Sequence, residues 1–380
     1  MKERDVLFGL HEMEGIGWHT IDRLKRAVGD LSVLASLSEA DIAALPVPPD
    51  GRGRGMSPQI ARRIHAASRE AWIAARKERL RRCGAGFLTA ADPGYPEWLA
   101  QIHCPPWVLY GIGNWELLRQ PVIAVVGTRT PTAYGRRIAR GLAADLSGAG
   151  WRVASGMARG IDGEAHAGAL TGPGGTIAVL ATPVDTPYPR EHAALYRRIC
   201  DEGLVVSETP IGLPLAKGLF PARNRIIAGL SLGTVVVEAD RRSGSLITAS
   251  FALEQNRELF AVPGPVSSPK SAGTNGLIQR SHAKLVTGAE DILEEFPEWV
   301  AAAAPSGGRP APPKTAADGD GGLSDDERLV LSFMSDVPVT FDQLLAATQF
   351  DFGQLHSVLL HLLMKNKIEQ QPGSSFIRHH

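Results

Sequence analysis

From Val122 onward, short apolar runs rich in β-branched residues alternate with longer segments of helical character. The strand-like runs are Val122–Val126, Arg152–Ser155, Thr176–Ala181, Leu204–Ser207, Thr234–Glu238 and Leu259–Val262. Such alternation is typical of a parallel sheet covered by helices on both faces, where the strands are apolar along their whole length. The pattern therefore predicts an α/β domain with a parallel sheet, whose ligands would bind beyond the carboxyl ends of the strands.

The first 82 residues have a helical pattern instead. Apolar positions such as Val6, Leu7 and Leu10 precede a break at residues 15–17, and a second helical pattern ends at Gly29. This predicts a helical domain over residues 1–82 that resembles a SAM or helix-hairpin-helix fold. The Gly-Ile-Gly turn either offers backbone N–H groups to a phosphate or has a packing role alone, and both interpretations remain open.

The remaining boundaries follow from composition. We expect the α/β domain to span residues 83–297, and the Pro- and aromatic-rich residues 84–114 to form extended segments at its edge. Residues 298–322 are rich in Ala, Pro and Gly and predict a flexible linker. Residues 323–380 predict three short helices and a β-hairpin, which together make a winged helix.

The third helix of that winged helix, expected near residues 352–365, is unusually apolar. Its leucines leave basic residues only at Lys365 and Lys367, so it lacks the polar, basic face of a helix that reads duplex DNA. We expect core packing together with a modest patch for a partner.

Charge and cysteine content narrow the class of protein. The chain has 40 Lys and Arg residues against 40 Asp and Glu, which argues against coating nucleic acid by bulk charge but permits a locally positive groove. A basic stretch between Arg52 and Arg82 is either a solvated helix face or a contact for the DNA backbone. The three cysteines fit neither a disulfide framework nor a C-x-x-C metal site. Without a signal-like or membrane-spanning apolar run, we expect a cytoplasmic protein that has no membrane anchor.

Two loops that follow predicted strands have the features of phosphate cradles. The first loop, Gly127–Gly135, places Arg129 just past a strand end, where it would act as a phosphate ligand. This loop lacks the G-x-G-x-x-G spacing, which disfavours a dinucleotide site. The second loop starts with Ser155 and Gly156 and presents Arg159. Further along this loop, Asp162 is expected to cap the next helix and His166 to pack within it, while Glu164-x-His166 lacks the i, i+4 spacing of a helical zinc pair.

The tract from Phe220 to Ser231 gives the strongest signal for a polyanion. It begins an apolar helix with an aromatic ring and polar side chains that suit phosphates and bases: Lys217 just before it, then Phe220, Arg223, Asn224 and Arg225. Arginine offers a planar fork of donors, the helix start offers free N–H groups, and an aromatic ring offers a surface for a base.

A further strand-to-helix step supplies small polar groups. It begins after Glu238, and its candidate ligands are Arg241, Ser243, Gly244 and Ser245. Glu238 itself is either a catalytic carboxylate or a residue that orients Arg223. We expect orientation, because no second carboxylate or nucleophile is evident nearby. Neither a metal nor an organic cofactor is predicted.

Taken in order, these tracts resemble the DNA-processing protein A family, also called DprA or Smf. The resemblance covers about residues 85–295 and rests on Val-Val-Gly-Thr-Arg, Ser-Gly-Met-Ala-Arg-Gly-Ile-Asp, Phe-Pro-Ala-Arg-Asn-Arg-Ile-Ile-Ala-Gly-Leu, Ser-Gly-Ser-Leu-Ile-Thr-Ala and Ala-Val-Pro-Gly. It implies an extended Rossmann-like parallel sheet. For function, it implies a recombination mediator of natural transformation that binds single-stranded DNA, forms homodimers and loads RecA onto DNA covered by single-strand-binding protein. It also implies that Arg129, Lys217, Phe220, Arg223 and Arg225 bind DNA.

The chain departs from the family pattern at two places. After the third strand, Ala181-Thr-Pro183 and Tyr188-Pro189 replace a glycine-containing turn, and Ser281-His282 stands where a glycine is expected. Two competing functions are an enzyme that hydrolyses nucleotides on a Rossmann-like scaffold and a winged-helix regulator of duplex DNA. Such a hydrolase would use a Pro-Gly-Gly-x-Gly-Thr loop that follows a strand, whereas Pro173-Gly-Gly175 precedes one, which disfavours this enzyme. The apolar third helix of the winged helix disfavours the regulator.

Overall fold

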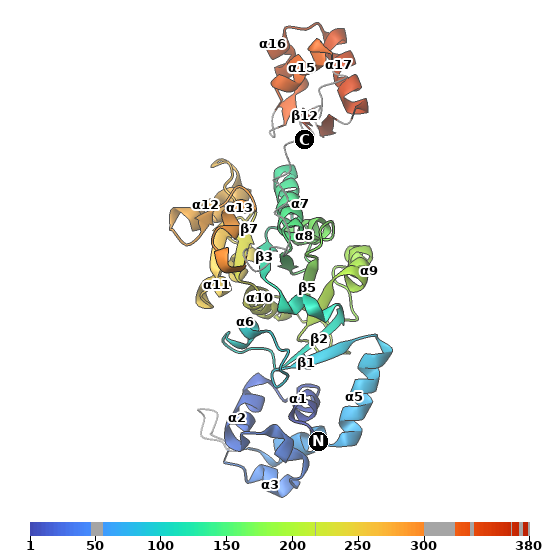
Figure 1. Ribbon diagram of the computed structural model, residues 1–380, viewed down its shortest axis with the longest axis vertical. Coiled ribbons are helices and arrows are strands. Elements are labelled where there is room, and N and C mark those ends of the chain that lie inside the picture. The colour runs from blue at the N-terminus through green and yellow to red at the C-terminus, as the bar shows by residue number, and fades with distance from the viewer. Residues whose placement is uncertain are drawn as a thin grey trace. The chain divides into compact units, whose positions relative to one another are not determined.

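A computed structural model describes residues 1–46, 56–216, 218–299, 324–334, 338–365, 367–371 and 375–378. The chain forms two compact units, Met1–Ala303 and Ala304–His380 (Figure 1). Among the residues described, no helix combines the length and the apolar character needed to cross a membrane.

The larger unit is built on a nine-stranded sheet in the order β1-β2-β6-β5-β4-β3-β7-β8-β9. Its strands are β1 (Gly86–Thr89), β2 (Val108–Gly113), β3 (Val122–Val126), β4 (Arg152–Ser155), β5 (Thr176–Leu180), β6 (Leu204–Ser207), β7 (Gly233–Val236), β8 (Glu258–Ala261) and β9 (Lys284–Leu285). The ladder from β6 to β9 is parallel, whereas β1 and β2 add an antiparallel edge. The predicted α/β architecture with a parallel sheet is confirmed.

The strand order reverses direction at β3. From β3 the chain proceeds through β4, β5 and β6 on one side, then returns to place β7 on the other side of β3. In an open parallel sheet, such a reversal opens a crevice outside the carboxyl ends of the strands. This geometry fixes where a ligand site is expected.

Helices cover both faces of the parallel sheet (Figure 1). On one face, α7 (Ala133–Gly148), α8 (Ile161–Ala169) and α13 (Glu290–Leu293) pack around Ile123, Val125 and the fully buried Trp151. On the other face, α10 (Leu219–Leu230), α11 (Ser245–Glu254) and α12 (Ala272–Gln279) contribute to a separate apolar cluster, which also includes Leu99 of α6 (Glu97–Ala100). Further out, α9 (Ala193–Glu202) packs along β6.

The N-terminal helices share a core with the antiparallel edge of the sheet. They are α1 (Glu3–His11), α2 (Trp18–Val28), the 3-10 helix η1 (Leu31–Ala35), α3 (Glu39–Ala43), α4 (Pro58–Ala67) and α5 (Glu70–Arg82). Phe8 of α1 is fully buried and stacks on Phe87 of β1, with ring centroids 4.3 Å apart. It also meets the edge of Tyr110 of β2 at 6.3 Å. One continuous apolar cluster therefore joins the helices to the sheet.

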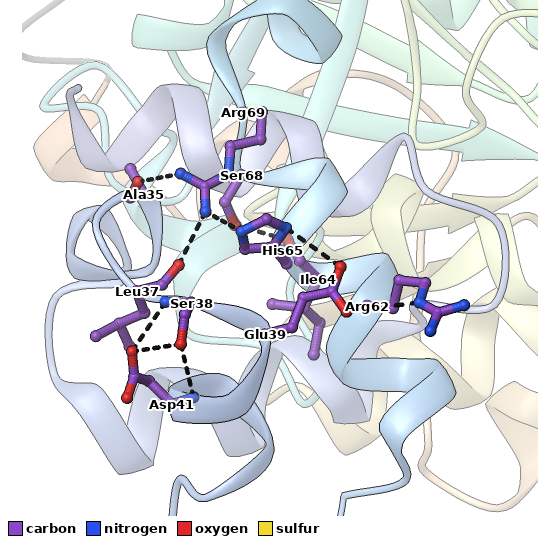
Figure 2. Close-up of polar contacts among 10 residues, drawn as sticks. All are labelled: Ala35, Leu37, Ser38, Glu39, Asp41, Arg62, Ile64, His65, Ser68 and Arg69. Carbon is purple, nitrogen blue, oxygen red and sulfur yellow. Dashed lines mark hydrogen bonds and ion pairs between the residues drawn. The ribbon is translucent and has the colours of Figure 1, made fainter.

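Arg69, just before α5, ties the helical region together (Figure 2). Its guanidinium donates hydrogen bonds of 2.9 Å to the carbonyl oxygens of both Ala35 and Leu37, and it contacts His65, which faces Glu39. The carbonyl groups that follow η1 are thereby satisfied by a side chain from a distant helix. Nearby, Ser38 and Asp41 form a capping box at the start of α3.

The helix end that lacks the expected glycine is held by a Schellman motif. Ser281 adopts a left-handed φ of 55°. Its N–H bonds to Ile278 O at 2.9 Å, and the N–H of His282 bonds to Leu277 O at 3.0 Å. These are the two hydrogen bonds that define the motif, so a serine occupies the position that glycine usually takes.

The smaller unit has a winged-helix fold. Helices α15 (Asp325–Ser332), α16 (Phe341–Thr348) and α17 (Phe352–Met364) pack beside the strands β10 (Val339–Thr340), β12 (Ser375–Arg378) and β11 (Ile368–Gln371), which are paired in that order. The expected capping box of Ser324 and Glu327 is present. The predicted hairpin turn at Pro372-Gly373 lies outside the described residues. In α17, Leu355, Leu359 and Leu362 are buried, so core packing accounts for much of its apolar character.

Candidate nucleic-acid interface

A crevice opens at the carboxyl ends of β3 and β4, where the strand order reverses. It consists of two adjoining cavities of about 380 and about 70 Å³ that share Arg129, Ala158, Phe220 and Arg223. The walls come from the loops after β3, β4, β5 and β7 and from the first turns of α10 and α11. We call this hollow the crevice.

The structure brings nine of the predicted site residues together at the crevice. The larger cavity is lined by Arg129, Phe220, Arg223, Asn224, Ser243, Gly244 and Ser245, and the smaller one adds Gly156 and Arg159. The loops of three strands thus converge, as the sequence pattern predicts for a parallel sheet.

Four other predicted residues are not placed at the crevice. Ser155 is fully buried, and its hydroxyl donates to Val125 O at 2.6 Å. Arg225 donates to the Glu208 carboxylate at 2.7 and 2.8 Å. Arg241 is exposed in the loop before α11 and is absent from the crevice lining, while Lys217 lies outside the described residues.

Arg223 forms the back of the crevice. It is buried, and one guanidinium nitrogen donates to Gly156 O at 2.7 Å and to Val179 O. Burial lowers the pKa of Arg223 to about 10, which leaves the side chain charged at neutral pH. Arg223 therefore joins α10 to the loop after β4 and to β5 itself, and also brings positive charge into the crevice.

Arg129 and two aromatic rings form the opening. Arg129 is exposed, and its guanidinium carbon lies 5.9 Å from the centroid of the Phe220 ring. On the other side, the Tyr188 ring lies 5.2 Å from the Phe220 ring at an angle of 54°. With 43% of its surface exposed, Tyr188 offers a flat face near the exposed guanidinium of Arg129, which suits a base next to a phosphate.

Sequence reasoning missed Tyr188 as a site residue. After β5, the sequence differs from the family pattern by lacking a glycine-containing turn, and we considered only that loss. The structure shows that this segment contributes Tyr188 and Thr182 to the smaller cavity. The sequence feature that could have identified Tyr188 is an aromatic residue in a loop that follows the carboxyl end of a predicted strand.

Asp162 has a different role from the predicted helix cap. Gly160 is the N-cap of α8, whereas the Asp162 carboxylate accepts hydrogen bonds from the backbone N–H groups of Gly156 at 3.1 Å and Ala158 at 3.2 Å. It thus fixes the loop after β4. Burial raises the pKa of Asp162, and the charges of Arg223 and Arg129 oppose this rise.

Glu238 does not orient Arg223, contrary to our expectation. Its carboxylate accepts from the Thr132 backbone N–H at 2.9 Å and from the Thr132 hydroxyl at 2.6 Å. The Thr132 hydroxyl in turn caps α7 by accepting from Gly135 N. Glu238 therefore positions the loop that carries Arg129.

His166 packs inside α8 as predicted. Its Nδ1 lies 2.7 Å from the Thr176 hydroxyl, which donates to Val153 O, so Nδ1 carries the hydrogen. Among the described residues, no group of three or more His, Cys, Asp or Glu side chains is arranged to hold a metal ion.

Comparisons with known proteins agree on one family. The model described as DNA recombination-mediator protein A matches residues 86–297, and the DprA winged helix domain matches residues 309–374. DNA processing protein DprA of Bacillus subtilis is 44% identical over 216 residues, which cover 57% of this chain and 72% of the relative. Protein Smf of Synechocystis is 34% identical over 319 residues, which cover 77% of this chain and 80% of the relative.

Solved structures give the same result. DNA processing protein A of Streptococcus pneumoniae superposes with a TM-score of 0.60 at 36% identity, covering 74% of this chain and 98% of that one. The Helicobacter pylori protein, described for its single-stranded DNA binding mode, has a TM-score of 0.52 at 30% identity, covering 56% and 96%. The chain therefore belongs to the DNA recombination-mediator protein A family, also known as DprA or Smf.

Proposed function

We propose that the crevice binds single-stranded DNA with little sequence preference. The observation that carries this proposal is the convergence of Arg129 and Arg223 with the neighbouring, tilted rings of Tyr188 and Phe220. Guanidinium groups bind phosphates of any sequence, and aromatic rings stack on any base. The single-stranded DNA binding mode described for the Helicobacter pylori relative supports the same assignment.

The role that follows is that of a recombination mediator which protects incoming DNA during natural transformation. On the family resemblance, the partners would be RecA, single-strand-binding protein and a second copy of this chain, in the cytoplasm. These partners and this location remain predictions, because the geometry of the crevice supports DNA binding alone.

We further propose that the crevice acts by binding and not by catalysis. Asp162 is the one carboxylate among the described residues that line it, and this carboxylate already accepts two backbone hydrogen bonds. A nucleotide-hydrolysing enzyme would need a free acid or base within reach of its substrate. The Pro173-Gly-Gly175 segment, which such an enzyme would need after a strand, instead leads into the amino end of β5, whereas the crevice lies at the carboxyl ends of the strands.

The test is fluorescence anisotropy of a labelled oligothymidine across a salt series, beside a duplex of equal length. We expect preference for the single strand and a steep loss of affinity with salt, because phosphate contacts release counterions. Arg129→Glu should weaken binding by at least about tenfold. Arg119→Glu, which reverses an exposed arginine paired with Glu116, is the matched control and should have little effect. Equal binding of the duplex, or an Arg129→Glu protein with full affinity, would disprove the proposal.

A further inference from the structure

A second hollow lies between the N-terminal helices and the sheet, in the same compact unit as the crevice. Its volume is about 1020 Å³, and its walls are the turn between α1 and α2, helix α5 and the loop that follows β6. The aromatic and basic residues among its lining are Trp18, Trp72, Trp107, Arg63, Arg76 and Arg79. We call this hollow the tryptophan groove.

The three indole rings are held in place by their own hydrogen bonds. The ring N–H of Trp18 donates to Pro105 O at 2.7 Å, that of Trp72 to Gly9 O at 3.1 Å, and that of Trp107 to Trp18 O at 3.2 Å. Trp18 and Trp107 also stack, with centroids 5.5 Å apart. The indole N–H groups are thus already satisfied, and a ligand would meet the flat, rigid parts of these half-buried rings.

One of the arginines has unused hydrogen-bonding capacity. The Glu12 carboxylate, 1% exposed, accepts from Arg79 at 2.5 Å and from the Tyr110 hydroxyl at 2.7 Å, so Arg79 is neutralised by a buried partner. Arg76 instead lies over the Trp72 ring, 3.0 Å from its centroid, and its Nε has no acceptor in the described part of the chain. That Nε is itself buried, but the half-buried Arg76 side chain forms no ion pair with a described residue, so its charge is available to an anionic ligand in the groove.

The other titratable groups of the groove leave it close to neutral. Glu208 is paired with Arg225, and burial lowers the pKa of His11 to about 4, which keeps it uncharged at neutral pH. Arg63 donates to the backbone oxygen of Glu14, whose exposed carboxylate makes no ion pair with a described residue. Attraction of an anion would therefore be modest, and stacking on the indoles would supply much of the affinity.

The groove and the crevice meet at the start of α10. Leu219 lines the groove, and the next residue, Phe220, lines the crevice. The two hollows therefore have walls at successive residues of α10. A polymer that extends along the start of α10 from Phe220 would next meet Leu219, which favours a long polymer over a separate small ligand.

We propose that single-stranded DNA held in the crevice continues into the tryptophan groove, where bases stack on the indoles and a phosphate lies beside Arg76. This inference rests on the proposed function and extends its binding site onto the N-terminal helices. It predicts that the groove contributes to affinity only for strands long enough to occupy both hollows.

The first test compares oligothymidines of about 6 and about 30 nucleotides, which bracket the ~4–16 nucleotides that a single-strand-binding fold covers. Arg76→Glu should weaken binding of the long strand by at least about fivefold and leave the short strand unaffected. Glu14→Lys, at an exposed position, should tighten binding of the long strand. Arg82→Glu is the matched control on the same helix, since Arg82 is 74% exposed and paired with Glu78. Thermal melting checks that each variant is folded.

The second test uses tryptophan fluorescence, because the residues that line the crevice include no tryptophan. The long strand should quench the emission and the short strand should not. Unchanged affinity for the long strand in both Arg76→Glu and Glu14→Lys would overturn the inference. So would tryptophan quenching by an oligoglutamate peptide but not by DNA, because that result would assign the groove to an acidic protein segment. If the short strand fails to bind at all, the crevice proposal fails, while the long-strand variants still decide the role of the groove.

Discussion

At the scale of single residues, the two arginines of the crevice have separable roles. Arg223 is buried and bonded to the carbonyl oxygens of Gly156 and Val179, whereas Arg129 is exposed at the opening. Arg223→Met should lower the free energy of unfolding by about 2–4 kcal/mol, because two buried carbonyl groups lose their donor. Urea unfolding measures this loss, and Arg129→Met should leave the midpoint unchanged. Equal midpoints for the two variants would show that Arg223 has no structural role.

Tyr188 provides a second test at this scale. If a base stacks on the exposed face of Tyr188, Tyr188→Ala should weaken oligothymidine binding by about 1–3 kcal/mol, and Tyr188→Phe should bind normally. Anisotropy with a short strand gives the comparison. Loss of binding in Tyr188→Phe would instead assign the effect to the hydroxyl group.

His166 makes stability depend on pH. Burial, together with the charges of His192 and Arg223, lowers the pKa of His166 to about 3 in the folded protein, below the usual value of 6.5. Below pH 6.5 the unfolded chain gains a proton that the folded chain does not, so stability is full above pH 6.5 and falls by roughly 1.4 kcal/mol per pH unit toward pH 3.

Urea unfolding at pH 7 and pH 5 should therefore show a smaller loss of stability in His166→Gln than in the unsubstituted protein. Some loss remains in the variant, since His11 also has a lowered pKa, of about 4. The same loss in both proteins would mean that His166 titrates normally.

Residue types and the positions of strand ends predicted most of the residues that line the crevice. They did not predict the ion pairs and hydrogen bonds that hold some candidate residues away from it. Arg129, Phe220 and Arg223 could be found because each follows a strand or starts a helix at the sheet edge. Arg225 shares that position in sequence, yet it turns to Glu208, a partner 17 residues earlier. No local pattern announces such a pairing, because it depends on how two loops meet in space.

At the scale of elements, the end of α12 contains a correctable strain. Ser281 has a φ of 55°, a conformation that costs a residue with a side chain more than glycine. Ser281→Gly should raise the free energy of unfolding by about 0.5–1 kcal/mol. Ser281→Ala is the control and should bring no gain, because alanine has the same steric cost. Denaturant midpoints of the two variants decide the matter, and a destabilised Ser281→Gly protein would contradict this account.

The parallel strands β3 to β8 were predictable to within two residues because each is a largely buried apolar run. The extended residues 84–114 were recognised, but not the antiparallel pairing of β1 with β2 and of β2 with β6. The pairing of β2 with β6 joins segments about a hundred residues apart in sequence, and prolines between β1 and β2 obscure the alternation there. Strand β9 has only the two residues Lys284 and Leu285, too few to form a pattern.

At the scale of the whole molecule, the shared core predicts how the protein melts. Because α1 and the sheet edge belong to one apolar cluster, the helical region and the sheet should unfold together, and the winged helix, which has its own core, should unfold in a separate transition. Phe8→Ala should destabilise the larger transition by about 3–5 kcal/mol and leave the smaller one in place. Leu355→Ala should do the reverse, and calorimetry of the full chain resolves both.

A separate transition for residues 1–82, shifted alone by Phe8→Ala, would contradict this prediction. It would mean that the stacking of Phe8 on Phe87 adds little to the cohesion of the unit.

The glycines around the crevice bear on how this site can evolve. A side chain at Gly156 would begin 2.5 Å from the Arg223 guanidinium, one at Gly127 would begin 2.5 Å from Ile161, and one at Gly160 would begin 2.4 Å from Thr128 O. No mutation at these three positions can introduce a nucleophile or a general base without rebuilding the loops. Descendants of this chain can therefore change the reach or preference of the site more readily through exposed positions such as Arg129 and Tyr188 than through these three glycines.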